Sequence, residues 1–270
     1  MYLNTTTAKI NELSNDDLTR LAPAIGATAP TEKASDRYSF VQTIEAINYL
    51  RDTGWIPVYA GQSNARTRDK LHHTKHLVRF TRPDLMVGGH RMDLLMYNSH
   101  DTGSSFQLIG GVFRFVCSNG LVIGDKMAEF RHRHIGFDGS AFAGSARQIG
   151  NHLGNVAGVI DDWNTIDMTE QERGVFAMAA RELVTGGDEN LVVRPESLLL
   201  PRRWDDRKKT DLWTTFNTVQ ENVIRGGVRV VDTEKRRARR SRAVKSIDKD
   251  KSLNQALWVL TQKMAELKTA

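Results

Sequence analysis

The sequence predicts an α+β fold: an antiparallel β meander preceded by one helix and followed by several packing helices, a basic arm and a C-terminal amphipathic helix. Between Trp55 and about Gly136, short runs of β-branched and aromatic residues alternate with turn residues, which is typical of strands. Apolar residues recur at helical spacing before and after this region. Strands that follow one another without intervening helices pair mostly antiparallel, and their separation from the helices favours α+β over a parallel α/β sheet.

The N-terminal part leads into the first helix of the core. Residues 1–38 are polar and mixed, with one short helix expected near Asp16–Ala24. Ser39 and Gln42 match a capping box, in which two side chains satisfy backbone N–H groups at a helix start. The box predicts a helix that begins there and ends at Gly54, because glycine commonly terminates helices.

The meander is expected to contain six strands separated by turns. Asn119-Gly120 is the strongest turn signal, because an Asn-Gly pair between apolar runs favours a tight hairpin. Arg82-Pro-Asp84 and residues 98–103 are interpreted as further turns. The expected strands are Trp55–Asn64, His76–Arg82, Arg91–Asn98, Gln107–Ser118, Leu121–Ile123 and Glu129–Ile135.

Beyond the meander the pattern becomes helical. Thr169 and Glu172 form a second capping box, and the pairs Gly186-Gly187 and Gly226-Gly227 each end a helix. A short strand is expected at Val228–Val231. The positions that define the buried faces are Ile149, Leu153, Val156 and Ile160, then Val175, Phe176, Ala179 and Leu183, then Trp213, Phe216, Val219 and Val223, and finally Leu253, Leu257, Leu260, Met264 and Leu267. The last stripe is spaced for a partner helix, in this chain or in a neighbouring one.

These elements predict four segments along the chain. They are a polar N-terminal segment at 1–38, an α+β core domain at 39–231, a basic arm at 232–251 and a C-terminal helix at 252–270.

Bulk composition narrows the class of protein. No run of eighteen apolar residues is present, which argues against a transmembrane helix, and the N-terminal residues lack the pattern of a secretory signal. Cys117 is the single cysteine, so no intrachain disulfide forms, in keeping with a reducing compartment. We therefore expect a soluble protein in the cytoplasm.

Positive charge is concentrated near the C-terminus. Between Arg202 and Lys251 sixteen Lys or Arg residues face eight Asp or Glu residues, an excess larger than the net charge of +6 of the whole chain. The stretch Lys235–Lys245 holds seven cations with no acid between them. Because the guanidinium group matches phosphate geometry, this density predicts contact with nucleic acid; the alternative is a solvated linker.

The strands around Arg114 and Arg131 supply a second candidate surface. Neighbouring residues of a strand point to opposite faces, so Arg131 and Arg133 share one face, whereas His132 and His134 share the other. Such a mixture of Arg, His and aromatic residues suits phosphates and stacked bases, although an ordinary half-buried sheet looks similar. The predicted nucleic-acid-binding residues are Arg114, Arg131, Arg133, Lys235, Arg236, Arg237, Arg239, Arg240, Arg242 and Lys245, with Phe115 or Trp55 as stacking candidates.

Catalytic, metal and cofactor motifs are weak by comparison. His72, His73 and His76 lie close together, but their spacing does not match a zinc-protease motif, and Cys117 has no second thiol. No phosphate-binding loop for a nucleotide is present, and the paired acids lack the arrangement of a two-metal site. We therefore predict no catalytic residue, metal or cofactor, and leave open whether the protein is an enzyme. A polar segment around Arg203, Asn217 and Glu221 is expected to form a packed network or a subunit contact.

Three phrases carry a resemblance to a known family. They are FRFVCSNGLVIGD at Phe113–Asp125, FRHRHIG at Phe130–Gly136 and LWTTFNTVQENVIRGG at Leu212–Gly227. They resemble a family of phage- and plasmid-borne proteins catalogued as a domain of unknown function, number 932. The matching residues are Arg114, Cys117, Ser118, Asn119, Gly120 and His134, then Trp213, Asn217, Gln220, Glu221, Asn222, Gly226 and Gly227. The resemblance is taken to cover about 38–230, with the basic run and the terminal helix outside it.

The resemblance implies a mobile genetic element in a bacterial host cell. The order of elements in this chain, a helix, a meander and further helices, is similar to that of single-strand annealing proteins of the RecT and Red-beta type. Those proteins form rings or filaments and need no nucleotide. The leading hypothesis is therefore a homo-oligomeric protein that binds or anneals single-stranded DNA without nucleotide hydrolysis. An inhibitor of a host DNA-processing enzyme and a metal-dependent nuclease built on the histidines are the alternatives.

Overall fold

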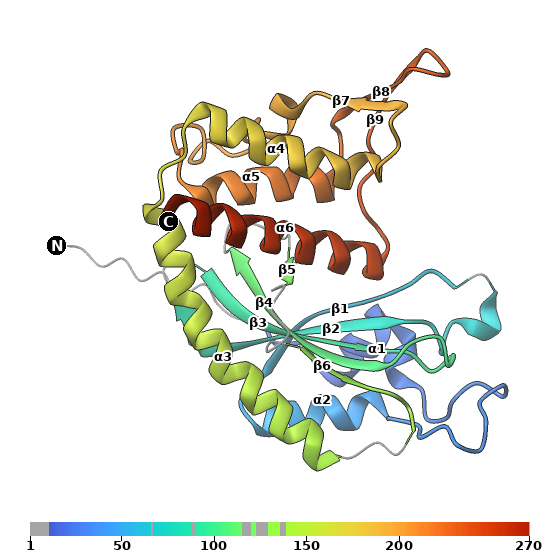
Figure 1. Ribbon diagram of the computed structural model, residues 1–270. Helices are drawn as coiled ribbons and strands as arrows, with labels where there is room; N and C mark the ends of the chain where they lie inside the picture. Colours follow the sequence, from blue (N-terminus) through green and yellow to red (C-terminus); the bar gives the residue numbers. More distant parts are fainter. Residues whose placement is uncertain are drawn as a thin grey trace. The chain divides into compact units, whose positions relative to one another are not determined.

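The computed structural model of the chain describes residues 11–65, 67–87, 90–114, 120–122, 129–135 and 139–269 (Figure 1). The chain divides into two compact units. The first unit comprises Met1–Met86, Arg91–Gly110 and Glu129–Gly150, and the second comprises Val87–His90, Gly111–Ala128 and Asn151–Ala270. The predicted α+β class is confirmed.

The first unit begins with a short helix whose start the sequence analysis did not identify. Helix α1 spans Asn15–Leu21 and is capped by Ser14, which forms a reciprocal capping box with Asp17. A short 3-10 turn, η1, follows at Pro23–Gly26. The short helix expected near Asp16–Ala24 is thus confirmed, with its start set by a box one turn earlier.

Helix α2, Thr43–Asp52, begins without the capping box that was expected at Ser39 and Gln42. Gln42 is the N-cap residue and its side chain makes no capping hydrogen bond. Ser39 instead donates its backbone N–H to the carbonyl oxygen of His134 at 2.8 Å, so a tertiary contact holds the residue that was expected to cap the helix. Gly54, with φ of +88°, lies just beyond the helix end as predicted.

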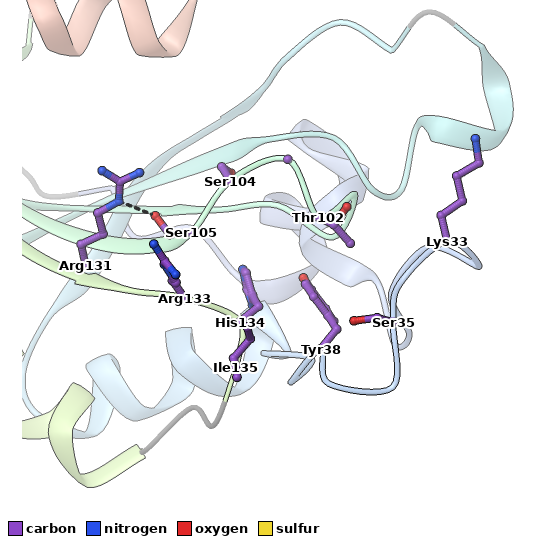
Figure 2. A pocket seen from close by; sticks show the side chains of 11 residues that line it. Lys33, Ser35, Tyr38, Thr102, Ser104, Ser105, Arg131, Arg133, His134 and Ile135 are labelled. Atoms are coloured by element: carbon purple, nitrogen blue, oxygen red, sulfur yellow. Dashed lines mark hydrogen bonds between the residues drawn. The ribbon is translucent and has the colours of Figure 1, made fainter.

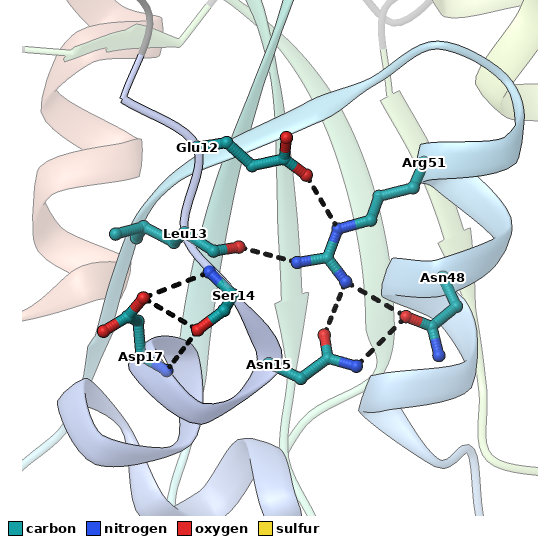
Figure 3. A network of polar contacts seen from close by, with 7 residues as sticks. All are labelled: Glu12, Leu13, Ser14, Asn15, Asp17, Asn48 and Arg51. Atoms are coloured by element: carbon teal, nitrogen blue, oxygen red, sulfur yellow. Dashed lines mark hydrogen bonds and ion pairs between the residues drawn. The ribbon is translucent and has the colours of Figure 1, made fainter.

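Arg51 attaches the N-terminal segment to α2 (Figure 3). Its guanidinium group donates to the carbonyl oxygen of Leu13 at 2.6 Å and to the side-chain oxygens of Asn15 and Asn48, and it lies 3.4 Å from the carboxylate of Glu12. One cation therefore orders a polar segment that has few apolar residues of its own.

The main sheet contains the six predicted strands, and its pairing is antiparallel where the register is known. They are β1 Ile56–Gln62, β2 His76–Val87, β3 His90–Asn98, β4 Phe106–Arg114, β5 Gly120–Val122 and β6 Glu129–His132. The order is β1-β2-β3-β4-β5, and β6 also pairs with β4. Phe106–Ile109 of β4 pairs with β6 in the first unit, and Gly111–Phe113 pairs with β5 in the second. The antiparallel pairing of β4 and β5 is confirmed, but the tight turn predicted at Asn119-Gly120 is wrong: Gly120 lies within β5 and pairs with Phe113, and Asn119 lies outside the described residues.

One expected turn is wrong. Residues 82–84 continue strand β2 instead of ending it. The guanidinium group of Arg82 forms an ion pair with the carboxylate of Asp84, because side chains two residues apart point to the same face of a strand.

Helix α3 spans Gly139–Thr165, and its N-terminal part packs in the first unit. Phe142 meets Phe106 edge-on, with ring centroids 5.4 Å apart, and also contacts Tyr49 of α2. Trp55, 2% exposed, is buried in the same unit, so the prediction that it stacks nucleic-acid bases is wrong.

The second unit is built on helices α4 Glu170–Thr185, α5 Leu212–Arg225 and α6 Ile247–Thr269 (Figure 1). The predicted capping box at Thr169 and Glu172 is confirmed. Trp258 of α6 lies 4.5 Å from Trp163, ring to ring, and Leu257 is fully buried. The terminal helix therefore finds its partner within this chain.

A small three-stranded sheet completes the second unit. Its strands are β7 Leu191–Val193, β8 Arg229–Asp232 and β9 Arg237–Arg240, in that order. Strand β8 was predicted; β7 was not, and β9 lies within the predicted basic arm. Between β8 and β9 the chain turns at Arg236, whose φ of +48° is unusual for a residue with a side chain.

Candidate nucleic-acid interface

The basic segment, Lys235–Lys245, is not an irregular linker, because its central residues form strand β9. Val230 pairs with Arg239 and Arg229 pairs with Arg240. Two arginines therefore face each other across the ladder, an arrangement that disfavours the sheet unless an anion lies between or near them. Arg240 partly offsets this by donating to the carbonyl oxygen of Gly227 at 2.9 Å.

The glycine pair after α5 holds the basic segment in place. Gly227 donates its N–H to the carbonyl oxygen of Ser241 at 2.8 Å, and Ser241 donates its backbone N–H to the carbonyl oxygen of Val228 at 2.7 Å. Gly226 has φ of +67°, and a Cβ atom there would lie 2.6 Å from the carbonyl carbon of Arg242. Glycine is required at this position both by the backbone conformation and by the close approach of the basic segment.

The cations of the basic segment are exposed and mostly unpaired. Lys235 lies 3.6 Å from the carboxylate of Asp232. Within the described chain, the six others have no ion pair with a carboxylate: Arg236, Arg237, Arg239, Arg240, Arg242 and Lys245. A surface with this many unneutralised guanidinium groups favours an anionic partner.

A cavity of about 560 Å³ opens beside β9. Its cations are Arg239, Arg242, Lys245 and Lys249, and its apolar lining includes Val223 of α5. The other lining residues are Leu183, Val184, Val230, Ser241, Ala243, Val244, Ser246 and Leu253. No acidic side chain appears among these lining residues.

A second basic pocket lies wholly in the first unit, which contributes Lys33, Arg131 and Arg133 to its lining (Figure 2). Its volume is about 750 Å³. The remaining lining residues are Ser35, Tyr38, Thr102, Gly103, Ser104, Ser105, His134 and Ile135. We call this cavity the first-unit pocket. Hydroxyl groups and cations surround it, and its lining residues include no carboxylate.

The two arginines line the same pocket, as expected for side chains of one face, although β6 ends at His132 and Arg133 lies just beyond the strand. Arg131 and Arg133 are both exposed, whereas His134 is 6% exposed. Arg131 donates through Nε to the hydroxyl of Ser105 at 2.8 Å, which orients its guanidinium group (Figure 2). In the part of the chain that the structure describes, neither arginine nor Lys33 forms an ion pair with a carboxylate.

His134 combines burial with an unused polar atom. Its ring stacks on Tyr38, with centroids 4.7 Å apart, and its Nδ1 lies 3.2 Å from the carbonyl oxygen of Ser39. A carbonyl oxygen only accepts, so Nδ1 carries the proton. The buried Nε2 has no hydrogen-bond partner among the described residues. Burial lowers the pKa of His134, and the nearby His132 lowers it further, so the ring is neutral near pH 7.

A buried polar cluster lies next to these residues and is organised by one hydroxyl. His76 Nδ1 lies 3.0 Å from the carbonyl oxygen of Thr74 and so carries the proton, which leaves Nε2 to accept from the Thr43 hydroxyl at 2.8 Å. The Thr43 oxygen then accepts from Asn98 Nδ2 at 3.0 Å and from His100 Nε2 at 3.2 Å. Three buried side chains thus depend on one oxygen atom.

Burial controls the protonation of this cluster. It lowers the pKa of His76 to about 4 and that of His100 to about 3. For His100, the neighbouring His76, His134 and His73 add to the effect, because each would repel a second positive charge. Both imidazoles are therefore neutral near pH 7, in agreement with the hydrogen bonds that they make.

Ser99 connects the buried cluster to the first-unit pocket. Tyr38 donates its hydroxyl to the carbonyl oxygen of Ser99 at 3.1 Å, and Ser104 donates to the Ser99 hydroxyl at 2.8 Å. Burial, with the nearby carboxylate of Asp101, raises the pKa of Tyr38 to about 12, so the phenol keeps its proton. The pocket wall is thus positioned by the cluster beneath it.

The structure brings some predicted site residues together and separates others. Arg131 and Arg133 share the first-unit pocket, whereas Arg239, Arg242 and Lys245 share the cavity beside β9 in the second unit. Arg114 ends strand β4, but its side chain lies outside the described part, as do Phe115 and Cys117 with all their atoms. Three further basic residues, Arg236, Arg237 and Arg240, are exposed and line neither cavity.

Sequence reasoning missed Lys33, Tyr38, Ser104 and Lys249. The first three reach their pocket from segments distant in sequence from its arginines, and no local motif marks them, whereas Lys249 lies within the predicted basic arm but outside its densest run of cations. Trp204 was also missed as an exposed aromatic: it is 76% exposed, with the guanidinium carbon of Arg207 lying 4.6 Å from its ring centroid.

The polar network predicted in the second unit is present in part. Arg203 lies 3.2 Å from the carboxylate of Glu221, which is almost fully buried, and Arg225 lies 3.1 Å from the same group. Asn217 instead donates to the carbonyl oxygen of Trp213 at 2.7 Å. Within the described ranges, His, Cys, Asp and Glu side chains form no group of three that could hold a metal ion.

Comparison with known proteins places the chain in a family. The model of the domain of unknown function DUF932 matches residues 30–258. The chain belongs to this family. The match reaches further than the sequence analysis expected, because it includes the basic segment and much of the terminal helix.

Two relatives in Escherichia coli (strain K12) support the assignment: the UPF0380 proteins YafZ and YfjQ. Each is 34% identical to this chain over 250 residues, which cover 93% of this chain and 90% of the relative. No solved structure matches the chain. Of the helices in the described part, none combines the length and the apolar content that crossing a bilayer requires.

Proposed function

We propose that this family member binds single-stranded nucleic acid, with DNA favoured, in the recombination of a phage or plasmid and without nucleotide hydrolysis. The observation that supports this most is the set of six exposed cations in the basic segment that have no carboxylate partner among the described residues. Phosphate contacts of this kind are independent of base sequence and depend strongly on salt. Annealing of complementary strands by a homo-oligomer extends the same proposal.

A single strand is favoured over a duplex because its bases are available for stacking. Trp204 exposes most of its surface, and Arg207 stacks on its ring. Stacking of a base on an exposed aromatic side chain contributes about 1–3 kcal/mol and tolerates any base. Trp204 therefore replaces Trp55 as the stacking candidate.

The first experiment measures affinity for a labelled oligonucleotide by fluorescence anisotropy, with a single strand and a duplex of the same sequence. The test variant changes Arg236, Arg237 and Arg239 to Gln. Truncation is unsuitable, because removing the residues after the basic segment would remove α6 and with it the buried Leu257 and Trp258. Point substitutions of exposed side chains leave that core intact.

The control variant removes the same charge from cations that already have partners. Arg20 and Lys263 are exposed, Arg181 is half-buried, and the three lie within 2.7 Å of Asp17, Glu266 and Glu182, respectively. We expect the basic-segment variant to lose about tenfold or more in affinity for single strands and the control to lose much less. Equal losses in the two variants would show that net charge alone matters. If the wild type binds a host DNA-processing enzyme but no oligonucleotide, the inhibitor hypothesis takes its place.

A further inference from the structure

The first-unit pocket combines three cations with one buried hydrogen-bond acceptor. Lys33, Arg131 and Arg133 supply the positive charge, and His134 Nε2 supplies a lone pair without a partner. Figure 2 shows Arg133 and His134 side by side in the lining, with Lys33 on a separate segment. An anion that fills this pocket therefore meets donors on most sides and an acceptor on one.

The acceptor restricts the chemistry of that anion. A phosphodiester carries no proton near neutral pH, so its oxygens would face the lone pair of His134 without forming a hydrogen bond. A phosphate monoester has its second pKa near 6 and still carries a P–O–H group in part of the population near pH 6.5. The P–O–H group of the monoester donates a hydrogen bond to Nε2 of His134, while the other phosphate oxygens accept hydrogen bonds from the guanidinium groups of Arg131 and Arg133.

In the absence of an anion, burial lowers the pKa of His134, the hydrogen bond to the carbonyl oxygen of Ser39 raises it in part, and His132 is the one among the groups around the ring that lowers it further. The groups that face the ring or act on it are Tyr38, His132, Arg131, Arg133, Lys33, His76 and His100, and Asp101 acts on Tyr38 from further away. Apart from Asp101 these groups are cationic or neutral. The imidazole therefore remains an acceptor until a ligand brings the proton.

The volume of the pocket leaves room for more than a phosphate group. At about 750 Å³ it is larger than the anion alone requires, and Ile135, which is 59% exposed, adds an apolar wall. The remaining space suits the sugar and base attached to a terminal phosphate.

We propose that the first-unit pocket binds a phosphate monoester, the terminal phosphate of a nucleic-acid strand. The monoester preference rests on the pocket itself, whereas the strand as its carrier rests on the function proposed above. Terminal phosphate recognition would hold one end of a strand whose remaining phosphates contact cations elsewhere.

The first arm of the test compares inorganic phosphate with sulfate by calorimetry at pH 6.5. Sulfate has the same shape but is an acceptor only at this pH. We expect phosphate to bind about tenfold or more tightly than sulfate and to move the ¹⁵N resonance of His134 Nε2, which sulfate leaves unmoved. Equal affinity for the two anions, with no histidine shift, overturns the monoester assignment.

Variants separate charge from proton acceptance. Arg133 is exposed, and Arg133→Gln should weaken the binding of both phosphate and sulfate by about tenfold. His134→Gln should remove the preference for phosphate; because this residue is buried, the resonance shift in the wild type is the independent measurement if the variant is unstable. Arg147→Gln is the matched control, since Arg147 is an exposed cation of the first unit that does not line the pocket, and it should change neither affinity.

The second arm compares single-stranded oligonucleotides with a terminal 5′-phosphate or 5′-hydroxyl, labelled at the 3′ end. We expect the phosphorylated strand to bind about fivefold or more tightly, and Arg133→Gln to abolish the difference. Equal binding of the two strands overturns the inference but leaves the proposed function standing. If neither strand binds while phosphate still exceeds sulfate, the proposed function fails and the pocket takes a free phosphate monoester instead.

Discussion

Replacing the Thr43 hydroxyl by a methyl group tests the buried cluster that positions the first-unit pocket. Thr43→Val keeps the shape of the side chain but removes the oxygen that serves His76, His100 and Asn98. Asn98 keeps its hydrogen bond to the carbonyl oxygen of Val41 at 3.1 Å, so two buried imidazole nitrogens lose a partner. Each such loss costs about 1–3 kcal/mol, and the new methyl group recovers part of it. We expect the free energy of unfolding of the first unit to fall by about 2–4 kcal/mol.

The matched control is Thr81→Val in the same unit. Thr81 is also fully buried, but its hydroxyl has no hydrogen-bond partner in the part of the chain that the structure describes. Removing it costs no hydrogen bond and relieves an unpaired polar atom in a strand, so stability should stay equal or rise by up to about 1 kcal/mol. Hydrogen exchange of amides in β2 and β3 measures both variants locally. If the two variants differ by less than about 0.5 kcal/mol, the bridging role of the Thr43 hydroxyl is refuted.

Three further outcomes follow from the structure. The pKa values of His76 and His100 in the folded chain lie below the ordinary value of about 6.5, so the unfolded chain binds protons at these two residues first as the pH falls. Each histidine should therefore lower the free energy of unfolding by about 2 kcal/mol between pH 7.5 and pH 5, as measured by denaturant titrations. Asp250 should offset about 1 kcal/mol of this loss, because burial raises its pKa to about 6 and the folded chain therefore binds a proton there before the unfolded chain does. A free energy of unfolding that stays constant over this pH range would contradict the burial of the histidine cluster. Gly226→Ala should lower stability by about 3 kcal/mol, since its Cβ would clash with the basic segment at a positive φ; an unchanged melting temperature would refute this. Arg236 has a left-handed backbone conformation that glycine adopts without strain, so Arg236→Gly should raise the free energy of unfolding by about 1 kcal/mol while it weakens nucleic-acid binding. A fall in the melting temperature of this variant would contradict the expected gain in stability.

Much of the fold was predictable because local signals and tertiary structure agree. The capping box at Thr169 works from side chains three residues apart, so no distant contact is needed to recognise it. The runs of apolar residues on either side of Asn119-Gly120 likewise predicted that β4 and β5 pair antiparallel, although the register, with Phe113 opposite Gly120, differs from that of a tight turn at this pair. Where a distant partner intervened, prediction failed: the backbone of Ser39 bonds to His134 instead of serving a cap.

The candidate site was predictable only in part, for the same reason. The density of cations marked the basic segment, but strand β9 forms because β8 offers an unpaired edge, and a run of arginines carries little strand propensity of its own. Arg131 and Arg133 could be placed on one face from alternation alone. Lys33 and Tyr38 join them from a segment about a hundred residues away, which no periodic pattern reveals.

The salt dependence of single-strand binding shows whether the basic segment contacts phosphate groups. The dissociation constant for one oligonucleotide is measured over a range of salt concentrations, for the wild type and for the variant with Gln at Arg236, Arg237 and Arg239. Each phosphate contact on a single strand contributes a slope of about −0.7 in the plot of log affinity against log salt. Since three cations are removed, the variant's slope should be shallower than that of the wild type by about 2. Identical slopes and affinities would contradict the proposal, because the basic segment would then make no contact with phosphate.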